Sequence, residues 1–226
     1  MNKRSKFLPA GLLLASLALF SSEALLGETW AYVDPQAPSQ PWPGNLGLDF
    51  TVNAPIVVTA LGAFNGAGDG VVNGGPIQVQ IFDQTTGNPV TPLATFTHGA
   101  GPNAGAYDLV PGGYDITQSI ADTVLGPGNY TVVAIGFSSQ DENGNVNISG
   151  PGPTENDGSG LITFTGARYD GNTSIDEPVS CVGCVVTNQF DAGTFEFEAT
   201  PEPGTVGLVA LGSLAMLVRL RSRRRA

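Results

Sequence analysis

The residues of this sequence that are best suited to chemistry are one histidine and one pair of cysteines. His98 lies in the glycine-rich stretch Thr97–Gly101, and no Gly-x-Ser-x-Gly motif precedes it. A Ser-His-Asp triad would have to use this histidine. A general base must be held in fixed geometry against its substrate, and a glycine-rich turn is a poor support for one. These residues therefore favour a protein that is not an enzyme.

The cysteines occur as Cys181-Val182-Gly183-Cys184. A structural zinc site needs four Cys or His ligands, and the chain has three such residues in all. A thioredoxin-like redox role needs a βαβ context, which the surrounding sequence does not provide. Two cysteines this close in an oxidising compartment usually form a disulfide. We expect a Cys181–Cys184 disulfide.

Oxygen-rich loops are candidates for calcium, which binds carboxylate, amide and carbonyl oxygens. Asp141, Asn143 and Asn145 are spaced like the start of an EF-hand loop, but Val146 stands where glycine is required and Gly152 where a glutamate is required. Two further loops of this composition are Asn156–Asp157 and Asp170–Asn172. The alternative is that all three are solvated turns. We predict no cofactor, with calcium at Asp141, Asn143 and Asn145 as the alternative.

Aromatic side chains in loops are candidates for stacking on sugar rings. Trp42 lies in the rigid turn Pro41-Trp42-Pro43-Gly44, and Tyr169 follows a predicted strand; Tyr107 and Tyr114 are the other two. Such residues more often belong to a hydrophobic core. The ligand-binding residues are not known from the sequence, and Trp42 and Tyr169 are the candidates.

The elements that must position these residues are short strands. Apolar runs separated by turn residues recur through residues 25–200, as in an all-β protein. In Leu46–Val52 every second residue is apolar, and in Thr194–Ala199 phenylalanines alternate with glutamates. The other predicted strands are Ile56–Phe64, Ile77–Phe82, Val90–Phe96, Tyr114–Ile120, Tyr130–Phe137 and Leu161–Thr165.

About eight strands in one domain predict a two-layer β-sandwich, jelly-roll-like rather than a closed barrel. The turn Asp83–Pro89, with Gly87 in it, predicts a hairpin. Tyr130–Phe137 is apolar on both faces, as expected for a central strand. The order of the strands does not follow from the sequence.

Positive charge is confined to the two ends of the chain. Lys3, Arg4 and Lys6 precede the apolar run Phe7–Phe20, and small residues follow it. This layout predicts a signal peptide helix over residues 1–24. The alternative is an N-terminal membrane anchor, but the apolar run is shorter than the ~20 residues that a spanning helix needs.

The C-terminal end carries a second apolar run. Pro201, Glu202 and Pro203 are followed by the uncharged stretch Gly204–Val218. The chain then carries a cluster of arginines, namely Arg219, Arg221, Arg223, Arg224 and Arg225. We predict a transmembrane helix in this segment, with the arginines cytoplasmic and the rest of the protein outside. A permanent C-terminal anchor is the alternative to a removable one.

Residues 201–226 resemble the PEP-CTERM sorting signal of Gram-negative bacteria, because the Pro-Glu-Pro signature, the apolar helix and the arginine cluster follow in that order. The resemblance implies processing near the signature by exosortase, a membrane enzyme with a cysteine nucleophile. It implies transient membrane anchoring, then delivery to the cell surface or extracellular matrix. Residues 156–197 also resemble a segment of uncharacterised PEP-CTERM proteins, for which no catalytic residues are assigned.

Residues 25–200 contain 18 acidic residues and one basic residue, Arg168, a net charge of −17. This charge repels nucleic acid and anionic membranes. We therefore expect a non-enzymatic surface or matrix protein that associates with exopolysaccharide or biofilm. One alternative is a carbohydrate-binding module. The second is a secreted glycoside hydrolase with paired carboxylates.

Overall fold

The computed structural model describes residues 29–33, 39–66, 70–72, 75–97, 108–109, 115–145, 154–179, 181 and 189–200. Within these ranges all regular secondary structure is β, and the paired strands are antiparallel. The all-β prediction is confirmed. The predicted signal peptide, residues 1–24, and the sorting segment, residues 201–226, lie outside the described residues. In the part of the chain that the structure describes, no helix has the length and apolar character to cross a membrane.

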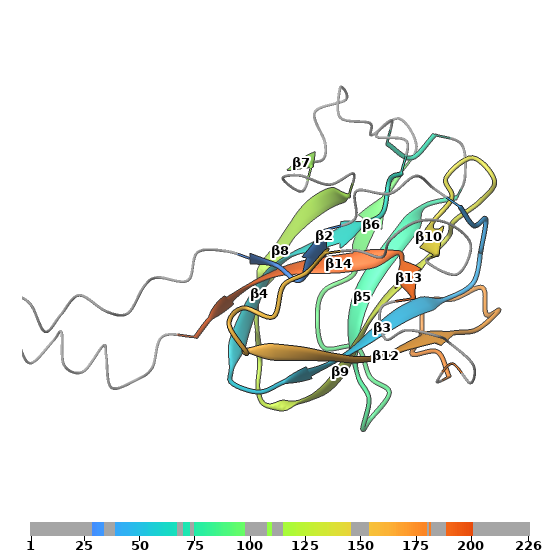
Figure 1. The fold of residues 1–226 in the computed structure, drawn as a ribbon. Coiled ribbons are helices and arrows are strands. Elements are labelled where there is room, and N and C mark those ends of the chain that lie inside the picture. The colour runs from blue at the N-terminus through green and yellow to red at the C-terminus, as the bar shows by residue number, and fades with distance from the viewer. Residues whose placement is uncertain are drawn as a thin grey trace, which may run out of the picture.

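Two five-stranded sheets form the body of the protein (Figure 1). The first, called the β4 sheet, has the order β1 (Thr29–Trp30), β14 (Gly193–Ala199), β4 (Ile56–Ala63), β8 (Ile116–Leu125) and β7 (Asp108–Leu109). The second, called the β9 sheet, has the order β12 (Ile162–Tyr169), β3 (Leu46–Val52), β9 (Gly128–Ile135), β5 (Ile77–Asp83) and β6 (Ala94–Phe96).

Two short ladders complete the described structure. β10 (Gly144–Asn145) pairs with β13 (Phe190–Asp191), and β2 (Tyr32–Val33) pairs with β11 (Thr154–Glu155). Eight of the described strands have three or more residues, as many as the sequence predicts. The jelly-roll likeness of the sandwich stays a prediction.

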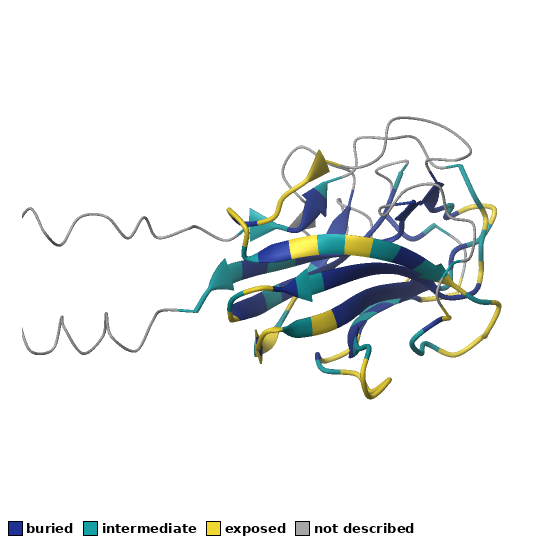
Figure 2. Ribbon diagram, turned by 60° about the horizontal axis from the view of Figure 1, so that its bottom comes forward, coloured by how far each residue is buried: buried dark blue, intermediate teal, exposed yellow. Residues whose placement is uncertain are grey.

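The two sheets share one hydrophobic core, because buried residues of both belong to a single cluster. Figure 2 shows the strands of the sandwich as mostly buried. In β3 the predicted inward residues, from Leu46 to Val52, are at most 2% exposed. Phe50 of the β9 sheet and Phe195 of the β4 sheet have ring centroids 4.7 Å apart, and both side chains are fully buried. Burying one such ring contributes about 1.5–3 kcal/mol. The predicted faces of β3 and β14 are confirmed.

β9 is the central strand of its sheet, paired to β3 on one side and β5 on the other. Val132 and Val133 point to opposite faces and are both fully buried. The prediction of a central strand at this position is confirmed. A strand that is apolar on both faces is stable only where both faces are covered.

The predicted hairpin forms after β5. The carboxylate of Asp83 accepts hydrogen bonds from the backbone N–H groups of Thr85 and Thr86, and Gly87 has a φ of +68°. The following strand is shorter than predicted, because only Ala94–Phe96 pairs with β5. β8 is longer than predicted and runs to Leu125, with a shift of register opposite Val58 and Ala60.

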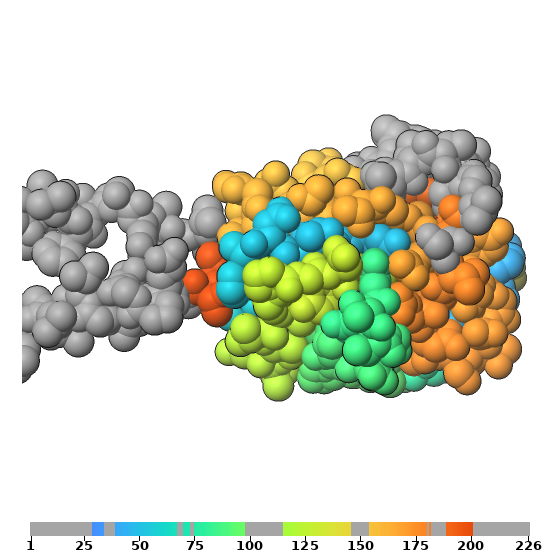
Figure 3. Space-filling model, turned by 90° about the horizontal axis from the view of Figure 1, so that it is seen from below, coloured from blue at the N-terminus to red at the C-terminus, as the bar shows by residue number. Residues whose placement is uncertain are grey.

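The sandwich has two poles, which the turns identify. At the first, called the terminal pole, short turns join Val52 to Ile56 and Leu125 to Gly128. β1 and the end of β14 lie here as well, since Thr29 pairs with Phe197 and Ala199 pairs with Ile56. Figure 3 shows the red end of β14 at the left of the molecule.

The opposite end, called the loop pole, is where β12 ends and β3 and β14 begin. Leu46 pairs with both Tyr169 and Ala134, and a Cβ added to Gly193 would lie 3.1 Å from Cβ of Ala134. The two sheets therefore meet there as well. In Figure 3 the orange surface of the β12 end and its following loop covers the right side of the molecule.

Candidate functional site

The two predicted ligand-binding aromatics lie together at the loop pole. The ring centroids of Trp42 and Tyr169 are 5.8 Å apart with an interplanar angle of 80°, so the rings form an aromatic corner. Phe190 supports the Tyr169 ring at 5.9 Å and is itself buried. Tyr169 is 42% exposed, and Trp42 packs partly against the core. Tyr107 and Tyr114 lie outside the described residues.

Strand pairing and one glycine hold this corner in place. β3 and β12 are neighbours, so the turn before Leu46 lies beside the residues that follow Tyr169. The indole N–H of Trp42 donates to the backbone oxygen of Asp170 at 3.0 Å. A Cβ on Gly44 would lie 2.1 Å from the same oxygen. Any other residue at position 44 would push the loop away from the turn.

The loop after β12 is closed around Asn45, which is fully buried. Nδ2 of Asn45 lies 3.0 Å from Oδ1 of Asp170 and 2.6 Å from Oδ1 of Asp176. It also lies 3.0 Å from the backbone oxygen of Ser174. Nδ2 of Asn172 bridges the other carboxylate oxygens of Asp170 and Asp176, at 3.1 and 3.0 Å. Two side-chain amides thus hold two carboxylates together.

This carboxylate pair bears on the hydrolase alternative. A glycosidase needs one carboxyl group to donate a proton and another to act as a base or nucleophile. All four carboxylate oxygens of Asp170 and Asp176 accept hydrogen bonds from Asn45 and Asn172. The two carboxylates therefore stabilise the conformation of the loop.

The single basic residue of the sandwich lies on β12. Nε of Arg168 is 2.7 Å from Oδ1 of Asp49, and its NH1 is 3.0 Å from Oε1 of Glu177. Burial raises the pKa of Glu177; the Arg168 guanidinium lowers it in part, while the Asp49 and Asp83 carboxylates raise it. The side chain of Arg168 is 18% exposed, and its charge is compensated by the two carboxylates that it contacts.

The predicted calcium loop uses its side chains in separate contacts. Oδ1 of Asp141 accepts a hydrogen bond from the backbone N–H of Val72 at 2.6 Å. Asn143 and Asn145 both donate to Oε1 of Gln40, at 3.2 and 3.1 Å. Among the described residues no group of three or more His, Cys, Asp or Glu side chains is placed to hold a metal ion. Calcium at this loop stays the untested alternative to the prediction of no cofactor.

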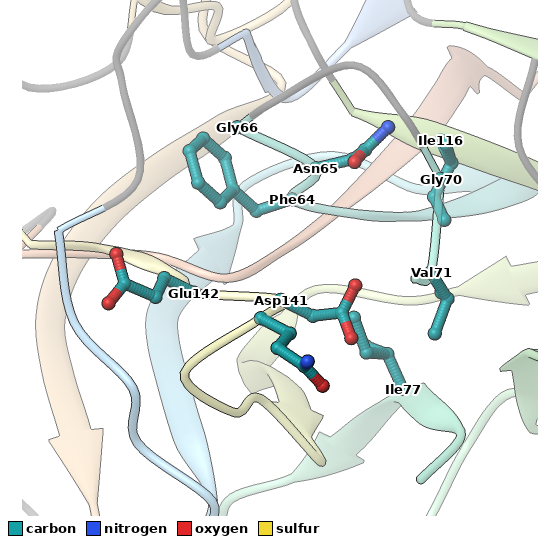
Figure 4. Close-up of a pocket in the computed structure, with 10 residues that line it drawn as sticks. Phe64, Asn65, Gly66, Gly70, Val71, Ile77, Ile116, Asp141 and Glu142 are labelled. Atoms are coloured by element: carbon teal, nitrogen blue, oxygen red, sulfur yellow. The ribbon is translucent and has the colours of Figure 1, made fainter. Parts of the chain in front are cut away.

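A small cavity lies beside Asp141 at the loop pole. Its lining includes Phe64, Asn65, Val71, Asp141 and Glu142 (Figure 4). The volume of about 20 Å³ is room for one water molecule. Nδ2 of Asn65, one of the lining residues, is buried without a hydrogen-bond partner in the described part of the protein.

The remaining predicted residues are only partly described. Cys181 is disulfide-bonded, and its backbone N–H donates to the oxygen of Ala167 at 3.1 Å. Cys184 lies outside the described residues, so the pairing stays a prediction. His98 and all residues of the sorting signal, from Pro201 to Arg225, also lie outside them.

Sequence reasoning missed Asn45 and Asp176, which organise the loop beside Tyr169. The spacing of oxygen-bearing residues in Asp170–Asp176 was a signal for a compact loop, but nothing in the sequence pointed to Asn45 as its centre. No family model matches the chain, and no curated protein matches it in sequence.

Proposed function

We propose that this chain is a non-enzymatic exported protein of the cell surface or extracellular matrix, associated with extracellular polysaccharide. Its C-terminal helix anchors it in the membrane until exosortase processes the Pro201–Pro203 signature. The jelly-roll-like sandwich is then a rigid carrier that presents loops to the matrix. The ends of the chain, the charge of the sandwich and the geometry of the described residues support this proposal.

The observation that carries the proposal is the position of the two ends of the sandwich. Thr29 pairs with Phe197, and β14 ends at Ala199 beside Ile56. The first and the last described residues of the chain therefore both lie at the terminal pole, where β1 and the end of β14 are seen in Figure 1. The Trp42–Tyr169 corner lies at the loop pole, so a protein anchored through residues 201–226 would direct it away from the membrane.

The second candidate function is that of a carbohydrate-binding module. The contact between Trp42 and Tyr169 favours it, because two ring systems from distant parts of the chain meet at one exposed place. Asp170 and Asp176 do not support the glycoside hydrolase, because their carboxylates are bonded to Asn45 and Asn172.

Intact-mass analysis of the chain, extracted from the surface of a Gram-negative host with exosortase, tests the proposal. We expect a species that lacks the arginines from Arg219 onward. Replacing Pro201, Glu202 and Pro203 by alanine should leave the unprocessed chain in the membrane fraction. Glu198→Ala, four residues before the signature glutamate, is the matched control and should be processed normally.

A surface-extracted species that still ends at Ala226 would contradict processing and favour a permanent anchor. A chain found only in the cytoplasm would contradict export itself. Either result is independent of what the sandwich binds.

A further inference from the structure

The two rings of the aromatic corner are held in place by their neighbours, and one polar group of the corner is available to a ligand. The indole nitrogen of Trp42 is bonded to the oxygen of Asp170, and the buried Phe190 ring packs against the Tyr169 ring at a centroid distance of 5.9 Å. The Tyr169 hydroxyl has no hydrogen-bond partner among the described residues. A ligand that lies on the Tyr169 ring therefore meets a fixed apolar surface with a free donor and acceptor at its rim. Fixed groups lose little conformational entropy on binding.

The charge around the corner restricts the ligand. Asp170, Asp176 and Glu177 are partly exposed carboxylates in the loop that follows Tyr169. Arg168, the one basic residue of the sandwich, is bonded to Asp49 and Glu177. An acidic ligand would therefore meet negative charge here with no free cation to balance it.

We propose that the Trp42–Tyr169 corner binds an uncharged saccharide. This inference rests on the proposed association with polysaccharide and names its chemical class. The C–H face of a sugar ring packs on the Tyr169 ring, whose π face is negative, and the nearly perpendicular Trp42 ring limits how far the sugar can slide. A sugar hydroxyl bonds to the Tyr169 hydroxyl.

Affinity electrophoresis of the full chain tests this inference, in a detergent without a sugar headgroup. The probes are dextran, a β-glucan and a galactomannan as uncharged polymers, with alginate as the acidic polymer and glycol chitosan as the amino polymer. We expect at least one uncharged polymer to retard the protein, and any effect of alginate, which the arginines at the chain ends can bind, to be the same in the Tyr169 variants. Tyr169→Ala should weaken the retardation about tenfold, the loss of one ring contact of about 1.4 kcal/mol.

Two further variants keep the test decisive if Tyr169→Ala fails to fold. Tyr169→Phe keeps the ring contacts with Trp42 and Phe190 but removes the hydroxyl, and should weaken binding about threefold. Val124→Ala is the matched control, because Val124 is 63% exposed and lies at the terminal pole. It should bind like the unchanged chain.

Retention of full binding by the Tyr169 variants that fold would overturn the site. Stronger Tyr169-dependent binding to alginate or to glycol chitosan than to every uncharged polymer would overturn the ligand class, as would no binding to any polymer. A chain that is exported and processed but shows one of these results would leave the proposed surface location intact.

Discussion

At the scale of single residues, two carboxylates of the sandwich pair with its one basic residue. Arg168 lies between Asp49, which is 7% exposed, and Glu177. A charged side chain such as that of Arg168 is costly to leave unpaired in a partly buried position. Because Arg168 is paired, the surface of the domain offers carboxylates and amides to a ligand but almost no positive charge.

Glu177→Gln should stabilise the protein at neutral pH. Burial raises the pKa of Glu177 above its ordinary value of 4.5, so the folded protein holds this proton more tightly than the unfolded chain does. Its favourable contribution is complete below pH 4.5 and is lost as the pH rises through the folded pKa. Glutamine stays neutral throughout, so the variant avoids this loss.

Urea unfolding at pH 7 and below pH 4.5 measures this effect. At pH 7 we expect a higher urea midpoint for Glu177→Gln than for the unchanged protein. Below pH 4.5 the two proteins should have equal midpoints, and this comparison is the control. A lower midpoint at pH 7 would mean that the bond to Arg168 outweighs the burial of the charge.

Cys181 and Cys184 should form a disulfide in exported protein, because the two thiols are close in sequence and the compartment is oxidising. Alkylation without reduction, followed by mass spectrometry, should find neither cysteine alkylated. Reduction before alkylation is the control and should expose both. Two alkylated thiols in periplasmic material would contradict the disulfide.

At the scale of elements, the strand edges are protected by local irregularity. The free edge of β12 is covered, since Tyr169 donates its N–H to the oxygen of Val179 and Cys181 donates to Ala167. β8 pairs with β7 at Ile116 and Thr117, and the register shift later in the strand distorts its free edge. Irregular edges discourage pairing with another chain.

The turn before β12 gives a prediction at this scale. Gly158 and Gly160 have φ angles of +61° and +90°, so alanine is strained at both by about 1 kcal/mol. A Cβ on Gly158 would lie 2.6 Å from Cε2 of the buried Phe197, whereas one on Gly160 meets no atom within 4 Å. Gly158→Ala should therefore cost a further ~1–3 kcal/mol through overpacking.

The free energy of unfolding of the two variants, measured in urea, tests the contact with Phe197. Gly160→Ala is the matched control for backbone strain alone. Equal losses in both variants would show that the turn moves away from Phe197 at no cost.

At the scale of the whole molecule, the sandwich carries a net charge of −17 between residues 25 and 200. Like charges destabilise the compact state at low salt, and added ions screen them. The two poles divide the molecule, with the chain ends at the terminal pole and the aromatic corner and the small cavity at the loop pole.

Calcium and sodium should raise the melting temperature equally at equal ionic strength. Asp141 is bonded to Val72, and Asn143 and Asn145 are bonded to Gln40, so their contacts already stabilise the fold without a cation. Melting curves in the two chlorides measure the difference. A specific site occupied at a hundred times Kd would add ~2.7 kcal/mol, a shift of a few degrees in calcium alone, and would contradict this expectation.

The sequence by itself determined where the eight longer strands lie and, for two of them, which face is buried. Alternation in Leu46–Val52 and in Thr194–Ala199 predicts both strands and their inward residues, because a strand places successive side chains on opposite faces. The prediction was less accurate for the bounds of β8, because the alternation of apolar and polar residues is interrupted near Ile120. A local sequence pattern says little about how long a strand is.

Only the tertiary structure decided which residues meet at the loop pole. Trp42 and Tyr169 are more than a hundred residues apart in the chain, and so are Asn45 and Asp176. Their contacts depend on the pairing of β3 with β12 in a single register. Many strand orders bury the same apolar faces equally well, so periodicity cannot choose among them. The choice is made by packing between the sheets and by close approaches such as that of Gly44 to Asp170.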